Sequence, residues 1–354
     1  MDVSRREVIK TTLAAGAAAL LGGQTLAQPV PPADPTAAAP DAADFTFVHV
    51  TDMHVTTRRQ GDRGYKACLR SIAALRPRPA FLLAGGDLAF DGLYTPKADF
   101  ARQVELYRRL TAECGIPCYH CLGNHDVLGW SSRRKVALDD PDLGKRFIMD
   151  RLGMQRSYYS FDHAGWHFVV LDSIYPKRFD HGPGYEPRIG PEQLEWLRYD
   201  LGAAGERPKV LVTHIAAFCN MGQINADPGY KAMDGHMVLW DTRELRTILE
   251  RHRVKALLQG HSHRIEDYCF NGVWYVTSAA ASGAWWAGNW VGSPPGYTVF
   301  HCRGQTLTWQ HVSFAWEPRL EPEDELERRR IAEQQAFERR QRELLAQERA
   351  GRRP

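Results

Sequence analysis

The chain of 354 residues contains 44% hydrophobic and 25% charged residues and carries a formal net charge of +3. A chain of this length can bury a large core, either as one decorated domain or as two smaller ones. No apolar run beyond the first residues approaches the roughly 18 residues that a membrane-spanning helix requires. Part of the small positive charge lies near the two ends of the chain, so the composition does not support a nucleic-acid-binding surface.

The N-terminus has the order of an export signal. Arg5 and Arg6 precede an apolar stretch at 13–21, and a small-x-small sequence ending at Ala27 follows. This order predicts a twin-arginine signal peptide over residues 1–27, because the apolar run is too short to span a membrane and too uniform for an amphipathic core helix. We therefore expect an exported protein, periplasmic or extracellular, with no transmembrane segment after removal of the signal.

The rest of the chain divides into three parts. Residues 28–43 form a Pro/Ala-rich linker, the globular domain is expected at 44–316, and a charged helical tail is expected at 317–354. The tail is rich in Glu, Arg, Gln and Ala, which favour helix, and its apolar residues make only a thin stripe. Two interpretations stay open: a solvated helix lying on the body, and a helix that binds a partner or dimerises.

Within the globular domain, short apolar runs alternate with segments of helical period, which is typical of α/β proteins. The main predicted strands are at 45–50, 80–84, 117–122, 209–212 and 254–258. The predicted helices are at 65–75, 97–114, 191–201 and 242–251. The last of these follows Asp241, with Glu244 three residues on, in the spacing of a capping box.

Further apolar runs complete the expected fold. Those at 157–161 and 166–171 flank a turn and predict a hairpin that joins the same core. A second sheet is predicted from the runs at 268–270, 273–278, 297–300 and 306–312. The expected fold class is therefore α/β, with two facing mixed β-sheets that form a sandwich flanked by helices.

The cysteines do not suggest a disulfide framework, because they are odd in number and scattered through a long chain. Cys114, Cys118 and Cys121, with His120, offer the alternative of a zinc site. They lie on a predicted strand, however, where a cysteine packs as a small hydrophobic side chain.

Residue types that bind metals follow each of the five main predicted strands. They are Asp52 and His54, Asp87, Asn124, His214, and His261 with His263. The carboxyl ends of strands in an open α/β sheet meet at one crevice, and residues two apart in extended chain point the same way. We therefore expect these side chains to converge, with the glycines before Asp87, Asn124 and His261 allowing close approach of the backbone.

The chemistry of this set favours two metal ions. Imidazoles, carboxylates and one amide oxygen suit manganese, iron, zinc or cobalt better than calcium. The set is too large for one tetrahedral ion, and it fits two ions that share one carboxylate roughly 3.5–4 Å apart, as in two-metal hydrolases. The expected cofactor is a pair of first-row transition metal ions, either iron, manganese or zinc.

Over residues 45–300 the sequence resembles the calcineurin-like metallophosphoesterases. The resemblance rests on Asp52-Met53-His54, Gly86-Asp87, Gly123-Asn124-His125-Asp126, His214 and Gly260-His261-Ser262-His263, in that order. It implies a metallophosphoesterase fold in which Asp52, His54, Asp87 and His263 bind the first metal. It further implies that Asp87 bridges to a second metal bound by Asn124, His214 and His261. By the same resemblance, Asn124 and His125 lie beside the substrate phosphate, and Asp126 orients His125.

The implied reaction is the hydrolysis of a small-molecule phosphodiester or phosphomonoester. Two cations lower the pKa of a bridging water, so that hydroxide attacks the phosphorus at neutral pH. His125, held by Asp126, is expected to protonate the leaving oxygen. Asp91 is either a partner of a ligand imidazole or an ordinary turn residue.

Two positions separate this chain from the purple acid phosphatases. These enzymes carry a tyrosine at the position of Phe90 and lack the histidine that is His54 here. The sequence is instead similar to bacterial cyclic-nucleotide phosphodiesterase-like members, which points to activity on 3',5'-cyclic nucleotides. The alternatives are an exported broad-specificity phosphomonoesterase, a protein phosphatase and, from another class, a non-catalytic metal-binding scaffold. The sequence does not indicate the oligomeric state.

Two loops are expected to select the substrate. The loop at 218–240 contains Asn220, Asn225, Lys231 and His236 and is long enough to form a lid. The Gly-rich stretch around Trp285, Trp286 and Trp290 stacks on a base or sugar, contacts a lipid headgroup, or packs in the core. His236, Trp285 and Trp286 are the candidate substrate-binding residues.

Overall fold

The structure is a computed structural model that describes residues 44–220, 236–314 and 316–351. The predicted signal peptide and the whole predicted linker lie outside the described residues, and so do Asn225 and Lys231 of the 218–240 loop. Within the part of the chain that the structure describes, no helix is both long and apolar enough to cross a membrane.

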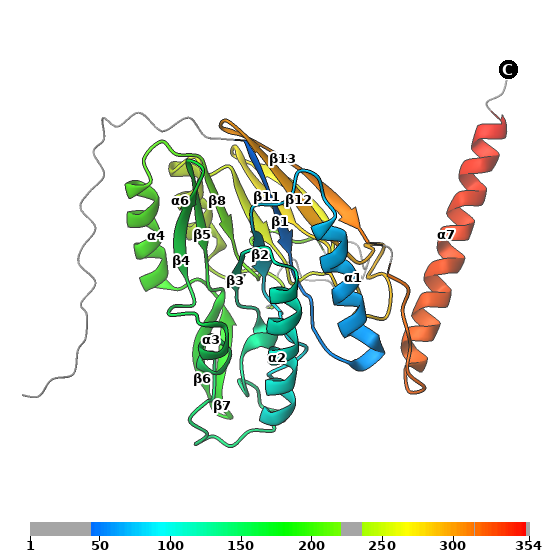
Figure 1. Ribbon diagram of the computed structural model, residues 1–354, viewed down its shortest axis with the longest axis horizontal. Coiled ribbons are helices and arrows are strands. Elements are labelled where there is room, and N and C mark those ends of the chain that lie inside the picture. Colours follow the sequence, from blue (N-terminus) through cyan, green and yellow to red (C-terminus); the bar gives the residue numbers. More distant parts are fainter. Residues whose placement is uncertain (1–43, 221–235, 315, 352–354) are drawn as a thin grey trace, which may run out of the picture. The chain divides into compact units, whose positions relative to one another are not determined.

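Two β-sheets form the centre of the domain (Figure 1). The first has the strand order β13-β12-β1-β2-β3 and the second the order β10-β11-β9-β8-β5-β4. The strands of the first sheet are β1 (Phe45–Val50), β2 (Leu82–Gly85), β3 (Cys118–Cys121), β12 (Gly296–Arg303) and β13 (Thr306–Ser313). Those of the second are β4 (Tyr159–His163), β5 (Trp166–Val170), β8 (Lys209–Val212), β9 (Ala256–Gln259), β10 (Glu266–Phe270) and β11 (Val273–Thr277).

The two sheets face each other across a layer of aromatic rings. The ring of Phe168, on β5, lies 5.3 Å from that of Phe47, on β1, and 5.1 Å from that of Phe81, which precedes β2. Each sheet contains parallel and antiparallel pairs, for example β1 with β2 and β1 with β12. This arrangement confirms the predicted α/β fold with two facing mixed sheets.

The assignment of the last strands to sheets differs from the expectation. Strands β12 and β13 do not join β10 and β11 in one sheet, because β12 pairs antiparallel with β1 and places Phe300 opposite Phe47. The hairpin of β6 (Ile174–Phe179) and β7 (Gly182–Pro187) forms a separate two-stranded sheet that the sequence did not indicate. A period of two identifies a strand, but the identity of its partner depends on contacts distant in the sequence.

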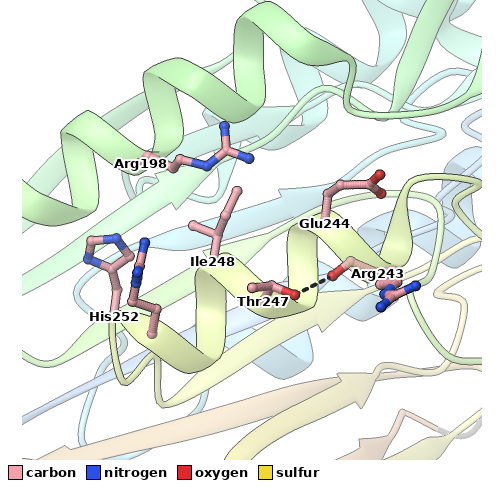
Figure 2. A pocket seen from close by; sticks show the side chains of 7 residues that line it. Arg198, Arg243, Glu244, Thr247, Ile248 and His252 are labelled. Carbon is pink, nitrogen blue, oxygen red and sulfur yellow. Dashed lines mark hydrogen bonds between the residues drawn. The ribbon is translucent and has the colours of Figure 1, made fainter.

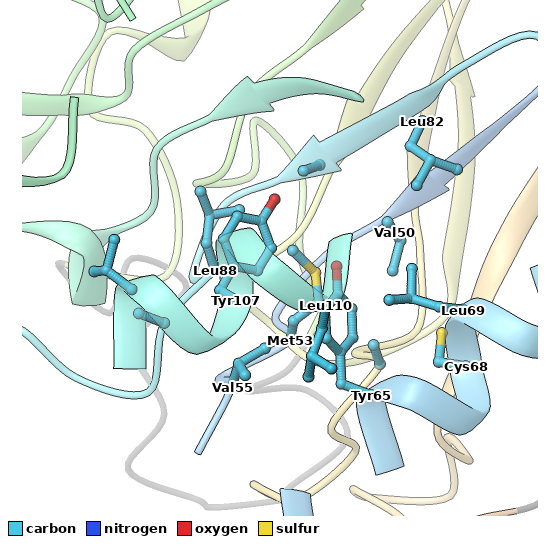
Figure 3. Close-up of a cluster of buried hydrophobic side chains, with 14 of the residues drawn as sticks. Val50, Met53, Val55, Tyr65, Cys68, Leu69, Leu82, Leu88, Tyr107 and Leu110 are labelled. Carbon is cyan, nitrogen blue, oxygen red and sulfur yellow. The ribbon is translucent and has the colours of Figure 1, made fainter. Parts of the chain in front are cut away.

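Helices cover the outer faces of both sheets. Helices α1 (Gly61–Ala73) and α2 (Lys97–Glu113) bury Tyr65, Leu69 and Tyr107 in a cluster with residues of β1 and β2, such as Val50 and Leu82 (Figure 3). Helix α3 (Arg146–Leu152) adds Phe147 and Ile148 to the same cluster. Helices α4 (Pro191–Ala203) and α6 (Thr242–Arg251) pack in the same way in a cluster with residues of β8 and β9. All four predicted helices are thus present, although α1 begins at Gly61 rather than at residue 65.

The predicted capping box at the start of α6 is wrong. Asp241 is the N-cap residue, but its side chain makes no capping hydrogen bond within α6. Its carboxylate instead accepts hydrogen bonds from the backbone N–H groups of Ile189, at 3.1 Å, and Gly190, at 2.9 Å. The carboxylate therefore ties the start of α6 to the start of α4, since two backbone donors outcompete the local cap.

The cysteines near β3 behave as core residues. Burial raises the pKa of the Cys118 thiol to about 12, and the Cys121 thiol lies 3.2 Å from the carbonyl oxygen of Leu171. Among the described residues, the groups arranged to hold a metal do not include these cysteines.

The tail forms helix α7 (Glu325–Gly351), as predicted from its composition.

Candidate metal centre

The predicted ligands come together at the carboxyl ends of strands from both sheets. Asp52 and His54 follow β1, Asp87 follows β2, Asn124 follows β3, His214 follows β8, and His261 and His263 follow β9. Their donor atoms form two groups, Asp52 with His54 and His263, and Asp87 with His214 and His261, and within each group these atoms lie within 4.8 Å of one another. Five of these six side chains are buried, and that of His261 is half-buried.

Asp87 contacts both groups. Its Oδ2 lies 3.5 Å from Nε2 of His54 and 3.3 Å from Nε2 of His214. Oδ1 of Asn124 lies 3.1 Å from the same nitrogen of His214. A carboxylate that lies between two groups of ligands can bind the metal ion of each group. Buried carboxylates are stable only when they are paired or bound to a metal. The donor set therefore fits two transition metal ions.

Backbone carbonyl groups orient three of the four histidines. His54 Nδ1 lies 3.1 Å from Phe90 O, His214 Nδ1 2.9 Å from Gly85 O, and His263 Nδ1 2.6 Å from Gly283 O. When Nδ1 donates to a carbonyl oxygen, the lone pair of a neutral imidazole is on Nε2, and it points into the cluster. His261 differs, because its Nε2 lies 3.0 Å from His236 O, which leaves Nδ1 as its candidate ligand atom.

Burial keeps two of these imidazoles neutral. It lowers the pKa of His54 to about 3 and that of His261 to about 4, so both offer a lone pair at pH 7. For His214, burial also lowers the pKa, but the Asp87 carboxylate outweighs this effect and raises it to about 9. The Asp87 carboxylate also acts to raise the pKa of His54, where burial outweighs it, so its charge acts on a histidine of each group.

The convergence does not arise from extended strands, as the sequence suggested. Asp52, His54, Asp87, His261 and His263 all have positive φ angles, between 41° and 69°. Such left-handed backbone is uncommon for residues other than glycine and clusters at functional sites, where surrounding contacts hold it. Here Asp52 N donates to Gly86 O at 2.9 Å and His54 N donates to Asp87 O at 2.8 Å.

Glycines allow the loops to approach one another. A Cβ atom at Gly123 would lie 2.2 Å from Oδ1 of Asp87, and one at Gly260 would lie 2.3 Å from Oγ1 of Thr51. Gly86 has a φ of +100° and faces the ring of His214. The prediction that glycines before the ligands permit close approach is confirmed.

His125 lies beside the cluster, but its partner is not the predicted one. Nδ1 of His125 is 3.2 Å from Oδ1 of Asp91, and the His125 ring lies 5.1 Å from that of His54. The carboxylate of Asp126 instead accepts hydrogen bonds from the N–H groups of Leu88 and Gly123, at 2.9 and 2.8 Å. The prediction that Asp126 orients His125 is therefore wrong, because Asp126 joins the loops after β2 and β3, and Asp91 takes that role.

The two tryptophans predicted to bind substrate have different environments. Trp286 is fully buried against Gly61 and Gly64, and its indole N–H donates to His54 O at 3.0 Å. The prediction that Trp286 binds substrate is therefore wrong. The ring of Trp285 is half-buried and lies 4.5 Å from that of His263.

A pocket of about 280 Å³ opens next to His125. Its lining residues are Arg58, Arg59, Phe90, Asp91, Tyr94, His125, Trp285 and Glu327. The sequence indicated His125, Trp285 and Asp91, and it singled out Phe90 only as the counterpart of a tyrosine ligand, but it missed the others. Arg58 and Arg59 lie only a few residues after His54, which is a weak signal, whereas nothing in the sequence connects Glu327 to this site.

His236 lies at the opposite group. Its carbonyl oxygen faces His261, and its ring lies 6.3 Å from that of Tyr185.

A second hollow lies between α4 and α6 and is lined by Arg198, Arg243, Arg251 and His252 among others (Figure 2). It contains none of the candidate ligands, so it is separate from the metal centre.

Comparisons with known proteins agree with this geometry. A family profile described as calcineurin-like phosphoesterase matches residues 45–264. A probable cyclic nucleotide phosphodiesterase from Synechococcus sp. is 27% identical over 232 residues, which are 64% of this chain and 76% of that protein. Purple acid phosphatase 21 of Arabidopsis thaliana is 26% identical over 208 residues, which are 56% of this chain and 41% of the plant protein.

Solved structures show a likeness of fold. Purple acid phosphatase PPD1 from yellow lupin (Lupinus luteus) seeds superposes with a TM-score of 0.53 at 13% identity. The superposition covers 78% of this chain and 53% of the lupin chain. The present chain thus spans about half the length of that phosphatase.

Proposed function

Because the chain belongs to the calcineurin-like phosphoesterases, and is thus a metal-dependent phosphoric ester hydrolase, we propose that it uses a dinuclear centre to hydrolyse small phosphodiesters. The observation that carries the proposal is the position of Asp87, whose Oδ2 lies within 3.5 Å of a histidine from each group. Asp52, His54 and His263 would hold one ion, Asn124, His214 and His261 the other, and Asp87 both. When bound, two such ions supply a nucleophile at neutral pH and stabilise negative charge on the phosphoryl oxygens.

His125 is proposed to be the proton donor. It lines the pocket next to the cluster, where the leaving oxygen of a bound ester would lie. Although burial lowers its pKa, the carboxylates of Asp87 and Asp91 raise it above its ordinary value. Asp91 accepts from Nδ1, which leaves Nε2 to face the substrate and protonate the departing oxygen.

The preference for diesters is supported by the pocket. Phe90, Tyr94 and Trp285 surround it with aromatic surface, and Arg58 adds a positive charge, a combination that suits a planar organic group on the phosphate. The Synechococcus relative named as a probable cyclic nucleotide phosphodiesterase agrees with such a substrate. Phe90 offers no side-chain oxygen that could bind a metal, and the oxygen that it presents to His54 is its backbone carbonyl, which argues against the tyrosine-ligated centre of purple acid phosphatases.

Metal replacement tests the proposal. The chelated protein would be assayed on bis-p-nitrophenyl phosphate, p-nitrophenyl phosphate and cyclic AMP after addition of manganese, iron or zinc. We expect activity to return with at least one metal and to be highest on a diester. Asp87→Ala should lose metal and activity, whereas Asp150→Ala, at an exposed carboxylate of α3, should lose neither. Absence of turnover on every ester with every metal would refute the proposal.

We also propose that the protein is exported through the twin-arginine pathway. The support is the order of Arg5, Arg6 and the apolar run at 13–21. Replacement of both arginines by lysine should retain the protein in the cytoplasm of a host with that pathway. Equal export of both forms would refute the proposal.

A further inference from the structure

The tryptophan loop, defined as residues 282–290, forms one side of the metal centre. The ring of Trp285 lies 4.5 Å from that of His263 and 5.6 Å from that of His54. It also lies 5.4 Å from the ring of Trp290 and lines the pocket beside His125. The position of this ring therefore sets the width of the space next to the first group of ligands.

The backbone of the tryptophan loop needs external support. Trp285 and Trp286 are consecutive residues with φ angles of 49° and 69°, a conformation that bulky side chains rarely adopt. Arg59 donates to Trp285 O at 3.0 Å, and Arg330 donates to Ala287 O at 2.8 Å and also to Asn289 O. Two guanidinium groups thus bind three carbonyl groups of the loop.

Both arginines depend on the C-terminal tail. Arg330 is itself a residue of α7. Arg59 is held by Asp324, through hydrogen bonds of 2.8 and 2.5 Å, and by Glu327, whose Oε1 lies 3.2 Å from its guanidinium group. Asp324 is buried, and Glu327 also lines the pocket. The start of the tail therefore lies against the loop and against the pocket.

We propose that the first turns of α7 position the tryptophan loop, so that Trp285 forms the wall that receives the organic group of the phosphate ester. The inference rests on the proposed function. Arg330 and Asp324 act through the loop and are positioning residues, whereas Trp285 contacts the substrate. The expected ligand is a phosphate ester with a flat, aromatic organic group, because the facing surfaces are the rings of Trp285, Tyr94 and Phe90.

Adjacent arginines of α7 provide a matched pair of variants. Arg330→Ala removes the bonds to Ala287 and Asn289, whereas Arg329→Ala removes only an exposed pair with Glu325, in which both side chains are 76% exposed. For each variant, kcat and KM on bis-p-nitrophenyl phosphate would be measured, together with the metal content and the Ki of inorganic phosphate. Inorganic phosphate probes the metals alone, because it carries no organic group.

For Arg330→Ala we expect KM to rise about three- to tenfold, the range that one lost aromatic contact produces, with kcat, metal content and the Ki of phosphate nearly unchanged. Arg329→Ala should match the wild type, and Arg330→Lys should bring KM back close to the wild-type value. If Arg330→Ala does not fold, Asp324→Asn weakens the hold on Arg59 without changing a residue that lines the pocket, and it should also raise KM.

Equal KM values for the two alanine variants would overturn the inference, since the contacts of Arg330 would then have no effect on substrate binding. A Ki of phosphate that rises in parallel with KM would also overturn it, since the loop would then act on the metal centre and not on the organic group. Those results leave the proposed function intact. Failure of the wild-type protein to hydrolyse any ester would instead refute the proposed function, and this inference with it.

Discussion

Replacement of Asp91 tests how the proposed acid is held. Oδ1 of Asp91 lies 3.2 Å from Nδ1 of His125 and also accepts from the backbone N–H of Leu93, at 2.9 Å, and of Tyr94, at 3.3 Å. Asp91→Asn retains an oxygen that can accept the two backbone bonds, but it removes the negative charge opposite the imidazole. The substitution therefore isolates the effect of Asp91 on His125 from its role in the turn.

The size of the effect follows from the type of bond. A hydrogen bond to a charged group contributes about 1.5–3 kcal/mol, so kcat should fall roughly 10- to 100-fold if this bond strengthens as His125 donates its proton. Removal of the imidazole in His125→Ala should cost more, about 100- to 10,000-fold, which is the range for a general acid. Both losses should be smallest for p-nitrophenyl phosphate and larger for phenyl phosphate, because nitrophenolate leaves without protonation.

The assay is a double-mutant cycle on these two substrates. If Asp91 acts through His125, Asp91→Asn should have no further effect in the His125→Ala background. Metal content should stay at the wild-type value in all variants, and Tm should change little. Losses that multiply independently, or the loss of a metal in Asp91→Asn, would refute the reasoning, since Asp91 would then act on the ligands and not on the acid.

Three further predictions concern stability and metal binding. Gly123→Ala should lose metal and activity, because the added Cβ would lie 2.2 Å from Oδ1 of Asp87. The φ of −100° at this residue suits alanine, so the effect would come from the displaced carboxylate and not from backbone strain. Metal analysis would show the loss, and a fully loaded variant would contradict it. Trp286→Ala should destabilise the protein by about 3–5 kcal/mol, since the side chain is fully buried; urea unfolding measures the change, and a loss below about 1 kcal/mol would contradict the assigned packing. Lys145→Met leaves the buried Asp172 carboxylate without its ion-pair partner and should cost about 3–5 kcal/mol; replacing Asp172 by Asn in the same chain should recover part of this, and no recovery would show that the pair is not the cause.

The residue types at the ends of the strands were decisive for the site. Because parallel strands bring their carboxyl ends to one edge, the order of Asp52, Asp87, Asn124 and His214 after separate apolar runs was enough to predict that they converge. The strands and helices could be predicted for a similar reason, since each buries one face and the hydrophobic period records it. These features are local in the sequence, or repeat with a period set by local geometry.

Other features depended on contacts between distant segments. The sequence offers two aspartates that could hold His125, namely Asp126, which is adjacent, and Asp91, which lies well before it. Only the fold shows that Asp126 accepts from backbone N–H groups instead. Trp285 and Trp286 are neighbours, yet the left-handed backbone turns one toward the pocket and the other into the core.

The sequence by itself indicated the family, the candidate metal-binding side chains and the α/β fold class, because these are carried by residue identity and hydrophobic period. Only the tertiary structure decided which carboxylate holds His125, which tryptophan is accessible, and that Asp324 and Arg330 of the tail contact Arg59 and the tryptophan loop. The physical reason is that hydrogen bonds across more than forty residues depend on how the packed elements bring backbone and side chains together, and no local pattern in the sequence records that arrangement.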